Sequence, residues 1–297
     1  MLPKKEIIEY ACTLNIDLIG FTDDSPLNNH SCIFQQWLDS GNAGDMKWLY
    51  KNPQNRYDPH ALLNDAKTVI CVAISYFSNS LPSREHISKY AASNDYHTVL
   101  GQKLRDLAQH MQNFDPGLNA RICVDSAPFA EKAFANRAGI GWQGKNSLIV
   151  NEKYGSWLFL GELIINRTYP TDQPALDRCQ NCTACIDACP TGAIRHNRSI
   201  DASKCLSYIS IEHSGAGQLE LYGKLFGCDE CQKACPWNTD PCQTREKQFT
   251  SPNKLYLSSL ENLKSMSNDE FSMHSKGTAF ERISFDQFTR NLRTIEK

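Results

Sequence analysis

Residues 179–190 read Cys-Gln-Asn-Cys-Thr-Ala-Cys-Ile-Asp-Ala-Cys-Pro, and residues 228–236 read Cys-Asp-Glu-Cys-Gln-Lys-Ala-Cys-Pro. In each run the cysteines stand three residues apart, the last follows after four, and a proline comes next. One further cysteine lies between the runs. The pattern therefore selects these thiols: Cys179, Cys182, Cys185, Cys189, Cys205, Cys228, Cys231 and Cys235.

Thiols in this order are the ligand set of two 4Fe–4S clusters. In such a two-cluster ferredoxin unit, the cysteine before each proline binds the cluster of the other run. One cluster is predicted to bind Cys179, Cys182, Cys185 and Cys235. The other is predicted to bind Cys189, Cys205, Cys228 and Cys231, with Cys205 in place of the leading cysteine that the second run lacks.

Zinc binding and disulfide bonding are both disfavoured for these thiols. Paired Cys-x-x-Cys motifs also build zinc ribbons, but a ribbon requires neither three cysteines at steps of three nor Cys-Pro at the end of both runs. So tight an array would also be a poor disulfide framework. The two-residue gaps let one tight turn present several soft thiolates to a small volume, and the proline then redirects the chain.

The chain has an ordinary globular composition, with 297 residues, 41% of them hydrophobic, and a formal net charge of −2. That charge does not indicate a nucleic-acid binder, so contact with a polyanion requires a local patch. The N-terminus shows no secretion signal, and no stretch is long and apolar enough to span a bilayer. The thirteen cysteines then indicate a reducing compartment, and we expect a cytoplasmic protein. The cysteines outside the array are expected to be small buried hydrophobes: Cys12, Cys32, Cys71, Cys123 and Cys242.

Strand and helix patterns alternate up to about residue 170. Strands are predicted at 17–21, 68–77 and 121–124, and helices at 3–14, 32–38 and 100–111. The segments 146–150 and 157–166 are predicted to pair with each other. The predicted fold is an α/β (α+β mixed-sheet) domain over 1–170, a ferredoxin-like double-cluster domain over 171–241 and a short helical tail over 242–297.

A second group of chemically suggestive residues follows the strand at 121–124. Asp125 stands at the end of that strand, where α/β sheets usually carry their chemistry. Gly139, Gly141 and Gly144 allow close approach of the backbone to something flat or bulky. The alternative role for Asp125 is the N-cap of the following helix. A phosphate loop at these glycines is disfavoured because the full dinucleotide-binding pattern is absent.

Over nearly its whole length the chain resembles the epoxyqueuosine reductases, cobalamin-dependent iron–sulfur enzymes that complete queuosine synthesis in tRNA. Besides the cysteine array, the resemblance rests on residues 94–97 (Asn-Asp-Tyr-His), 124–128 (Val-Asp-Ser-Ala-Pro), 137–146 (Arg-Ala-Gly-Ile-Gly-Trp-Gln-Gly-Lys-Asn), 154–157 (Tyr-Gly-Ser-Trp), 160–162 (Leu-Gly-Glu), 235–238 (Cys-Pro-Trp-Asn), 280–282 (Phe-Glu-Arg) and 290–291 (Arg-Asn). It implies a cobalamin between the α/β and cluster domains, reduced by the clusters, which removes the epoxide oxygen from the modified wobble base.

The resemblance also implies roles for individual residues. Asp125 matches the family's proton donor, and we expect burial against the corrin to raise its pKa. The residues expected to line the corrin are Arg56, Ser88, Asp125, Ile149, Leu160, Ser207 and Asp229. Of these, Ile149 and Leu160 fit ordinary core packing equally well. The Asp-x-His-x-x-Gly signature is absent, which predicts base-off cobalamin, without a histidine on the cobalt.

The implied partners are tRNA, through an anticodon stem-loop carrying epoxyqueuosine, and an external electron donor such as flavodoxin or ferredoxin. We expect a monomer without membrane contact. Tyr96 and His97 are expected either to position the substrate or to be structural. Candidates for phosphate contacts, each equally consistent with solvated surface charge, are Lys224, Arg245, Lys247, Lys254, Arg282, Arg290 and Arg293.

Two alternative functions remain. A cobalamin and iron–sulfur reductive dehalogenase shares the implied architecture, but such enzymes are typically exported, and both the missing export signal and the motif around Asp125 disfavour it. A non-catalytic carrier of electrons with two clusters has no need of an α/β domain of about 170 residues. The sequence therefore favours a tRNA-modifying reductase over both.

Overall fold

A four-stranded antiparallel sheet forms the centre of the computed structural model, which describes residues 1–215 and 220–295. The strands are β1 (Leu18–Asp23), β2 (Thr68–Ser75), β3 (Ala120–Cys123) and β6 (Leu158–Ile165), in the order β1-β2-β6-β3. Since β6 is antiparallel to both β2 and β3, those two strands run in the same direction. The residues that follow them, among them Asp125, therefore emerge at one edge of the sheet.

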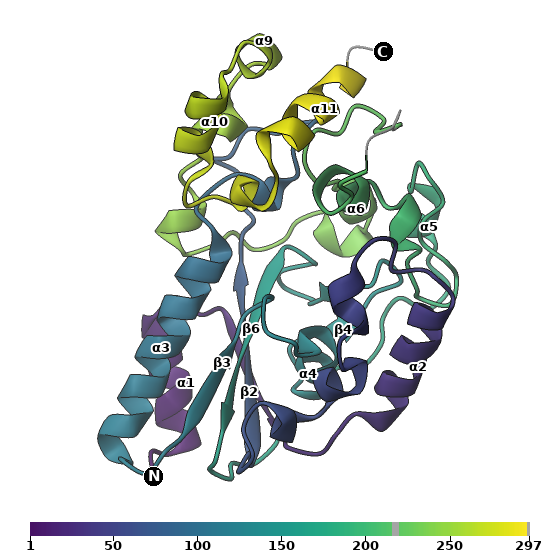
Figure 1. The fold of residues 1–297 in the computed structure, drawn as a ribbon. Coiled ribbons are helices and arrows are strands. Elements are labelled where there is room, and N and C mark those ends of the chain that lie inside the picture. Colours follow the sequence, from purple (N-terminus) through teal and green to yellow (C-terminus); the bar gives the residue numbers. More distant parts are fainter. Residues whose placement is uncertain (216–219, 296–297) are drawn as a thin grey trace.

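Helices cover both faces of this sheet (Figure 1). The helices α1 (Lys4–Thr13) and α3 (Tyr96–Phe114) pack on one face, and α4 (Glu131–Arg137) packs on the other. All residues of β2 are buried. This double coverage explains the near-continuous apolar run predicted as a strand at 68–77, because a strand covered on both faces has no solvent-facing side.

The remaining elements are short and surround the sheet. The strands β4 (Trp142–Gln143) and β5 (Ile149–Val150) form a separate pair. The other helices are α2 (Asn28–Asp39), α5 (Ala184–Asp187), α6 (Leu206–Ile211), α7 (Glu230–Lys233), α8 (Lys254–Leu257), α9 (Leu260–Lys264), α10 (Asn268–Ser275) and α11 (Phe285–Ile295). The predicted mixed α/β fold with a helical C-terminal region is confirmed.

One predicted strand pairing is wrong. The segment 146–150 contributes β5, which pairs with β4, whereas β6 pairs with β2 and β3. From Phe159 to Ile165 every residue of β6 is buried. A strand with two apolar faces requires a helical layer on each side, so β6 takes a central place in the sheet instead of joining the segment nearest in sequence.

The burial predicted for the additional cysteines is correct for Cys71 and Cys123 and wrong for Cys12, Cys32 and Cys242, which are exposed. The two buried thiols lie on strands of the covered sheet. The exposed thiols lie on α1, on α2 and in the segment after the second cysteine run. Cysteine is a frequent core residue as a type, but the tertiary contacts decide which individual cysteines are covered.

The C-terminal helices share a hydrophobic core with residues 81–92. Leu81, Ile87 and Ala91 pack in one cluster with Phe280 and Phe288. This packing brings the 81–92 segment, which precedes α3 in sequence, against the part of the chain that follows the cysteine runs. Within residues 1–215 and 220–295, no helix combines the length and apolar character needed to cross a bilayer.

Candidate active site and cofactor cavities

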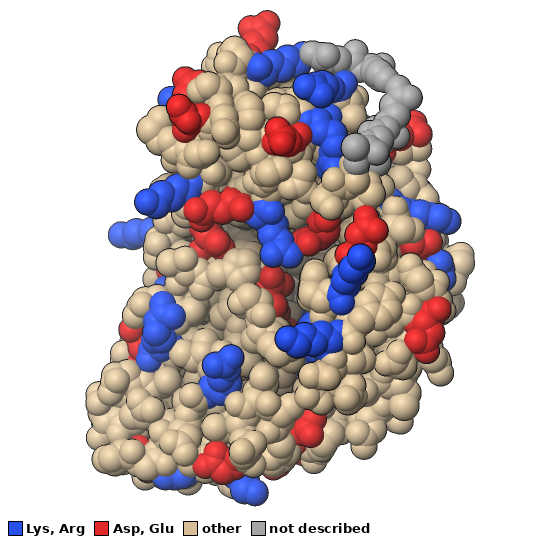
Figure 2. Space-filling model, viewed as in Figure 1, with Lys and Arg blue, Asp and Glu red and all other residues tan. Residues whose placement is uncertain are grey.

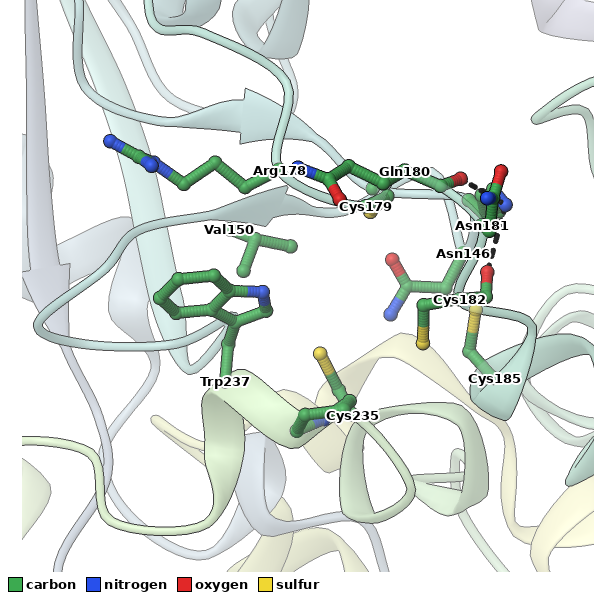
Figure 3. A pocket seen from close by; sticks show the side chains of 13 residues that line it. Asn146, Val150, Arg178, Cys179, Gln180, Asn181, Cys182, Cys185, Cys235 and Trp237 are labelled. Carbon is green, nitrogen blue, oxygen red and sulfur yellow. Dashed lines mark hydrogen bonds between the residues drawn. The ribbon is translucent and has the colours of Figure 1, made fainter.

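The first predicted set of cluster ligands lines one cavity of about 380 Å³. Its members are Cys179, Cys182, Cys185 and Cys235. Figure 3 shows their sulfur atoms around a common space, which Trp237 and Val150 flank on one side. The last cysteine of the second run thus lies with the first run, as the crossed ligand pattern predicts. The indole N–H of Trp142 donates a hydrogen bond to Cys179 Sγ at 3.3 Å.

The second predicted set lines a separate cavity of about 360 Å³. Its members are Cys189, Cys205, Cys228 and Cys231. Burial raises the pKa of Cys228 to about 11, so this thiol keeps its proton until a metal replaces it. Among the described residues, no three His, Cys, Asp or Glu side chains are placed to hold a single metal ion. Thiols that surround a space fit a polynuclear cluster better than one zinc ion.

A third cavity, of about 910 Å³, adjoins the second. The residues that line both are Tyr90, Tyr96, Asp125, Lys132 and Ser207. Figure 2 shows the molecule hollowed between the sheet and the C-terminal helices, with acidic and basic side chains bordering the hollow. The volumes of both adjoining cavities fall within the range typical of cofactor and ligand sites in proteins.

The structure brings together most of the residues predicted to line the corrin. The second cavity is lined by Ser88, Leu160 and Asp229, the third by Arg56, and both by Asp125 and Ser207. Ile149 lies instead in the core beside α4, with 3% of its surface exposed. The Nε atom of Arg56 is buried without a hydrogen-bond partner among the described residues. A buried donor left open in a cavity wall fits a bound group that carries amide or other acceptor oxygens.

Asp125 occupies a strained turn between β3 and α4. Its φ angle is +46°, in the left-handed region that residues other than glycine rarely adopt. The N-cap of α4 is Ala130, so the alternative role of Asp125 as a helix N-cap is wrong. The main-chain N–H of Asp125 donates to the carboxyl group of Glu131 at 2.5 Å. The Asp125 side chain is 60% exposed and opens into the cavities.

His97 bridges two carboxylates at this site. Its Nδ1 lies 2.7 Å from Asp95 Oδ1, and its Nε2 lies 3.1 Å from Asp125 Oδ2. Burial lowers the pKa of His97, but the hydrogen bonds to the two carboxylates outweigh that effect and raise the pKa to about 9. His97 is therefore protonated at neutral pH and donates from both ring nitrogens.

The rise in the Asp125 pKa expected from burial against a corrin stays a prediction. In the structure, partial desolvation within the cavity raises the pKa of Asp125, but the hydrogen bond and positive charge of His97 outweigh that effect, and the pKa lies below its usual value. Asp125 is accordingly ionised at neutral pH. In this site the proton resides on His97, next to the aspartate.

Glu131 and Glu162 are two carboxyl groups to which the sequence assigned no role. Burial, together with the charge of Asp125, raises the pKa of Glu131 to about 8. Glu162 on β6 is completely buried, and burial followed by the charge of Glu131 raises its pKa well above the usual value. The sequence signal that could have identified Glu162 is its position as the one carboxylate in the apolar strand sequence Leu-Phe-Leu-Gly-Glu-Leu-Ile-Ile at 158–165.

The predicted phosphate-contacting residues differ in their surroundings. The ion pairs are Lys224 with Glu230, Arg245 with Asp17 and Arg282 with Glu212. Arg290 donates to the main-chain carbonyls of Ile209, His213 and Gly215. Lys247, Lys254 and Arg293 are exposed. Arg290 is therefore engaged in holding the segment after α6, whereas the last three side chains face solvent.

Two family models match parts of the chain. The model described as "Epoxyqueuosine reductase QueG, DUF1730" matches residues 56–126, and the "4Fe-4S double cluster binding domain" matches residues 178–238. The first match ends just past the strained turn at Asp125, and the second contains all the array cysteines.

Known proteins resemble the whole chain. The epoxyqueuosine reductase of Vibrio cholerae is 36% identical, with 97% of this chain and 81% of that protein aligned. An epoxyqueuosine reductase crystallised with an epoxyqueuosine-modified tRNA-Tyr stem loop has a TM-score of 0.89 at 28% identity, covering 98% of this chain and 80% of that one. A reductive dehalogenase, whose structure suggests a mechanism for B12-dependent dehalogenation, shares the fold, with a TM-score of 0.51 at 15% identity over 97% of this chain and 37% of that one. Because the likeness to named reductases spans nearly every residue, the chain belongs to the epoxyqueuosine reductase family.

Proposed function

We propose that this reductase converts epoxyqueuosine to queuosine at the wobble position of tRNA, with electrons passing through two 4Fe–4S clusters to cobalamin. One observation carries the proposal. Asp125 and the cysteines of the second set line the same cavity, so a redox group held there lies between an iron–sulfur cluster and a proton-handling residue. Family membership and the tRNA stem-loop complex of a related reductase support the choice of substrate.

The reaction needs both electrons and protons. Removing the epoxide oxygen breaks two C–O bonds and forms a C=C bond, and it consumes two electrons and two protons as the oxygen leaves as water. Cobalamin, when bound, would supply a low-valent cobalt that passes the electrons to the epoxide carbon. The two electrons come from an external one-electron carrier of the flavodoxin or ferredoxin type. Cys182 is exposed, so we place electron entry at the first cluster and exit at the second.

The cavity walls suit a corrin without a histidine on its cobalt. The residues that would hold it are Arg56, Ser88, Leu160, Ser207 and Asp229, and Ile149 remains a prediction from the resemblance. Among the described residues that line the two cavities, His97 is the one histidine, and carboxylates occupy both of its nitrogens. This arrangement supports base-off binding, because a histidine engaged at both nitrogens has none left for a metal.

Asp125 delivers protons that it receives from His97. The imidazolium of His97 stores a proton at neutral pH, and the Asp125 carboxylate, which faces the cavity, passes that proton to the departing oxygen. The third cavity would receive the modified base. Its rim carries the half-exposed indole of Trp48 and the ion pair between Arg282 and Glu212.

The test is an anaerobic assay of the reconstituted protein, with added cobalamin and a chemical reductant, on tRNA that carries epoxyqueuosine. Nucleoside analysis of the tRNA should show queuosine replacing the epoxide form, and omitting cobalamin should abolish the conversion. Failure to convert the tRNA in protein that holds both clusters and cobalamin would overturn the proposal. Dehalogenation of a halogenated phenol in the same preparation would favour the second candidate function, which the shared dehalogenase fold makes worth testing.

A further inference from the structure

Glu131 is bonded directly to the turn that presents Asp125. It is the first residue of α4, and its carboxyl group accepts the main-chain N–H of Asp125. The left-handed φ of Asp125 is unfavourable for a non-glycine residue, so the turn requires outside contacts to persist. The contacts that hold Asp125 include a hydrogen bond from His97 to its side chain and one from its main chain to Glu131.

Glu131 also faces the reaction space. It lines the second cavity together with Asp125, Tyr96 and Lys132. Behind it lies Glu162, whose two carboxyl oxygens are buried with no hydrogen-bond partner among the described residues. A buried carboxyl without partners is strongly unfavourable when ionised. Glu162 is therefore neutral at neutral pH. Glu131 beside it is largely neutral as well, because burial and the charge of Asp125 raise its pKa to about 8.

The ionisable groups around Glu131 come from every element packed against it. They are Asp125 in the preceding turn, Lys132 on α4, Tyr96 and His97 on α3, Glu162 on β6, Cys71 on β2 and Cys123 on β3. The Asp125 carboxylate opposes a charge on Glu131, and Lys132 and His97 favour one. Because burial acts with the charge of Asp125, the two cations do not offset the combined effect.

We propose that Glu131 is a positioning residue for the reduction, which holds Asp125 in place through the main chain and stores the second proton that the departing oxygen requires. The inference rests on the proposed function. His97 supplies one proton through Asp125, and Glu131, which lines the same cavity, supplies the other. Both end in the water formed from the epoxide oxygen, while the two electrons arrive from the one-electron carrier through the clusters. Glu131 and His97 both return to their protonated forms by exchange with the solvent of the open cavity.

Three variants separate the two parts of this role. Glu131→Gln keeps an oxygen that accepts the Asp125 N–H but has no acidic proton. Glu131→Leu removes both the acceptor and the proton. Glu9→Gln is the control, because Glu9 lies on the outer surface of α1 with 62% of its side chain exposed. All variants are prepared with both clusters and checked for iron content and thermal unfolding, so that Glu131→Gln carries the test even where Glu131→Leu is unstable.

The first readout is independent of turnover. Infrared difference spectra of the cluster-loaded protein, without cobalamin or tRNA, report the C=O stretch of protonated carboxyl groups as the pH is varied. The wild type and Glu9→Gln should lose one such band as the pH passes about 8. That band should be absent from Glu131→Gln, while the band of Glu162 persists to higher pH. A band that titrates near pH 8 and survives in Glu131→Gln would overturn the proposal.

The second readout is the pH profile of kcat on epoxyqueuosine tRNA. The Glu131→Leu substitution should lower kcat on the order of 100-fold and Glu131→Gln on the order of tenfold, with KM unchanged in both. In Glu131→Gln the alkaline fall in kcat should move from about pH 8 to about pH 9, where His97 titrates. Equal losses in both variants with an unmoved profile would show a merely structural role and overturn the proposal. An unchanged kcat in Glu131→Gln would overturn it as well.

The two readouts also separate this inference from the proposed function. If the wild type fails to convert the tRNA while the carboxyl band behaves as expected, the proposed function fails and the protonated state of Glu131 stands. If the wild type converts the tRNA but the band is unaffected by the glutamine substitution, the proposed function stands and the role of Glu131 falls.

Discussion

The Nε2 atom of His97 lies 3.1 Å from the Oδ2 atom of Asp125, while the Nδ1 atom of the same ring lies 2.7 Å from Asp95. Asp125, which the sequence marks at the end of a strand, is therefore one end of a charged network. His97 carries a positive charge at neutral pH and Asp125 a negative one. Asp125 raises the pKa of His97 and His97 lowers the pKa of Asp125, so each stabilises the charged form of the other. The network places a protonated imidazole next to the cavity.

Replacing His97 with glutamine should reduce kcat on the order of 100-fold without changing KM, because the proton store beside Asp125 is lost. The pKa of Asp125 should rise toward its ordinary value, since the cation that lowers it has gone. The component of the pH profile near pH 9 should disappear. His110→Gln on the same helix is the control. A rate and profile identical to those of the wild type would remove His97 from proton delivery.

Replacing Asp125 with asparagine should keep both clusters and bound cobalamin but lower kcat on the order of 10²–10⁴-fold. Asparagine preserves the size of the side chain and cannot pass a proton onward. Iron content and cobalamin absorbance measure retention of the cofactors, and single-turnover formation of queuosine measures the chemistry. Asp106→Asn, on the exposed side of α3, should behave as the wild type. Turnover that survives in Asp125→Asn would contradict the assigned role.

Replacing Cys205 with alanine should lower the iron content from about eight to about four atoms per chain, because each 4Fe–4S cluster requires its full set of thiolates. Cys205 lines the second cavity with Cys228 and Cys231. Cys242→Ala is the matched control, since Cys242 is exposed. Iron analysis and electron paramagnetic resonance of the reduced protein provide the measurement. Two intact clusters in Cys205→Ala would show that the ligand pairing is wrong.

Replacing Glu162 with leucine should stabilise the protein, more so at pH 8 than at pH 5. The folded state raises the pKa of Glu162 above its ordinary value of 4.5, so above pH 4.5 the folded chain retains a proton that the unfolded chain releases. The free energy of unfolding therefore falls as the pH rises through that window. Removing a buried carboxyl group without partners should raise the free energy of unfolding by about 1 kcal/mol or more, which corresponds to a rise of about 2–4 °C in Tm.

Thermal unfolding at the two pH values, in anaerobic buffer with intact clusters, tests this effect of Glu162. Glu9→Leu, an exposed substitution, should show no such difference. A Glu162→Leu variant less stable than the wild type at pH 8 would mean that the carboxyl has a partner that stabilises the fold.

Replacing Arg290 with glutamine should lower Tm by a few degrees and leave the salt dependence of tRNA binding unchanged, because its guanidinium holds carbonyls of the segment after α6. Replacing the exposed Lys247 with glutamine should instead reduce the slope of log affinity against log salt by roughly 0.7–0.9, the contribution of one phosphate contact. Fluorescence anisotropy with a labelled anticodon stem-loop measures both. A reduced slope for Arg290→Gln would place that side chain on the phosphates.

The sequence alone determined the parts of the protein that depend on local spacing. The cysteine runs specify which thiols can meet on two clusters, since ligand steps of three and four residues and the closing prolines act over a few residues of chain. The apolar run of β2 likewise predicts burial on both faces. The position of Asp125 at a strand end, and the family motifs around it, marked the site without any knowledge of its neighbours.

Only the tertiary structure decided which groups surround Asp125 and in which protonation state. His97 is 28 residues away in sequence, and Glu162, which lies near Glu131, belongs to a strand whose partners were predicted wrongly. A pKa depends on burial and on charges a few ångströms away, and neither is encoded in local periodicity. For the same reason the sequence left open whether Ile149 packs in the core, where the structure places it, and gave no sign that the His97 imidazole beside Asp125 is protonated.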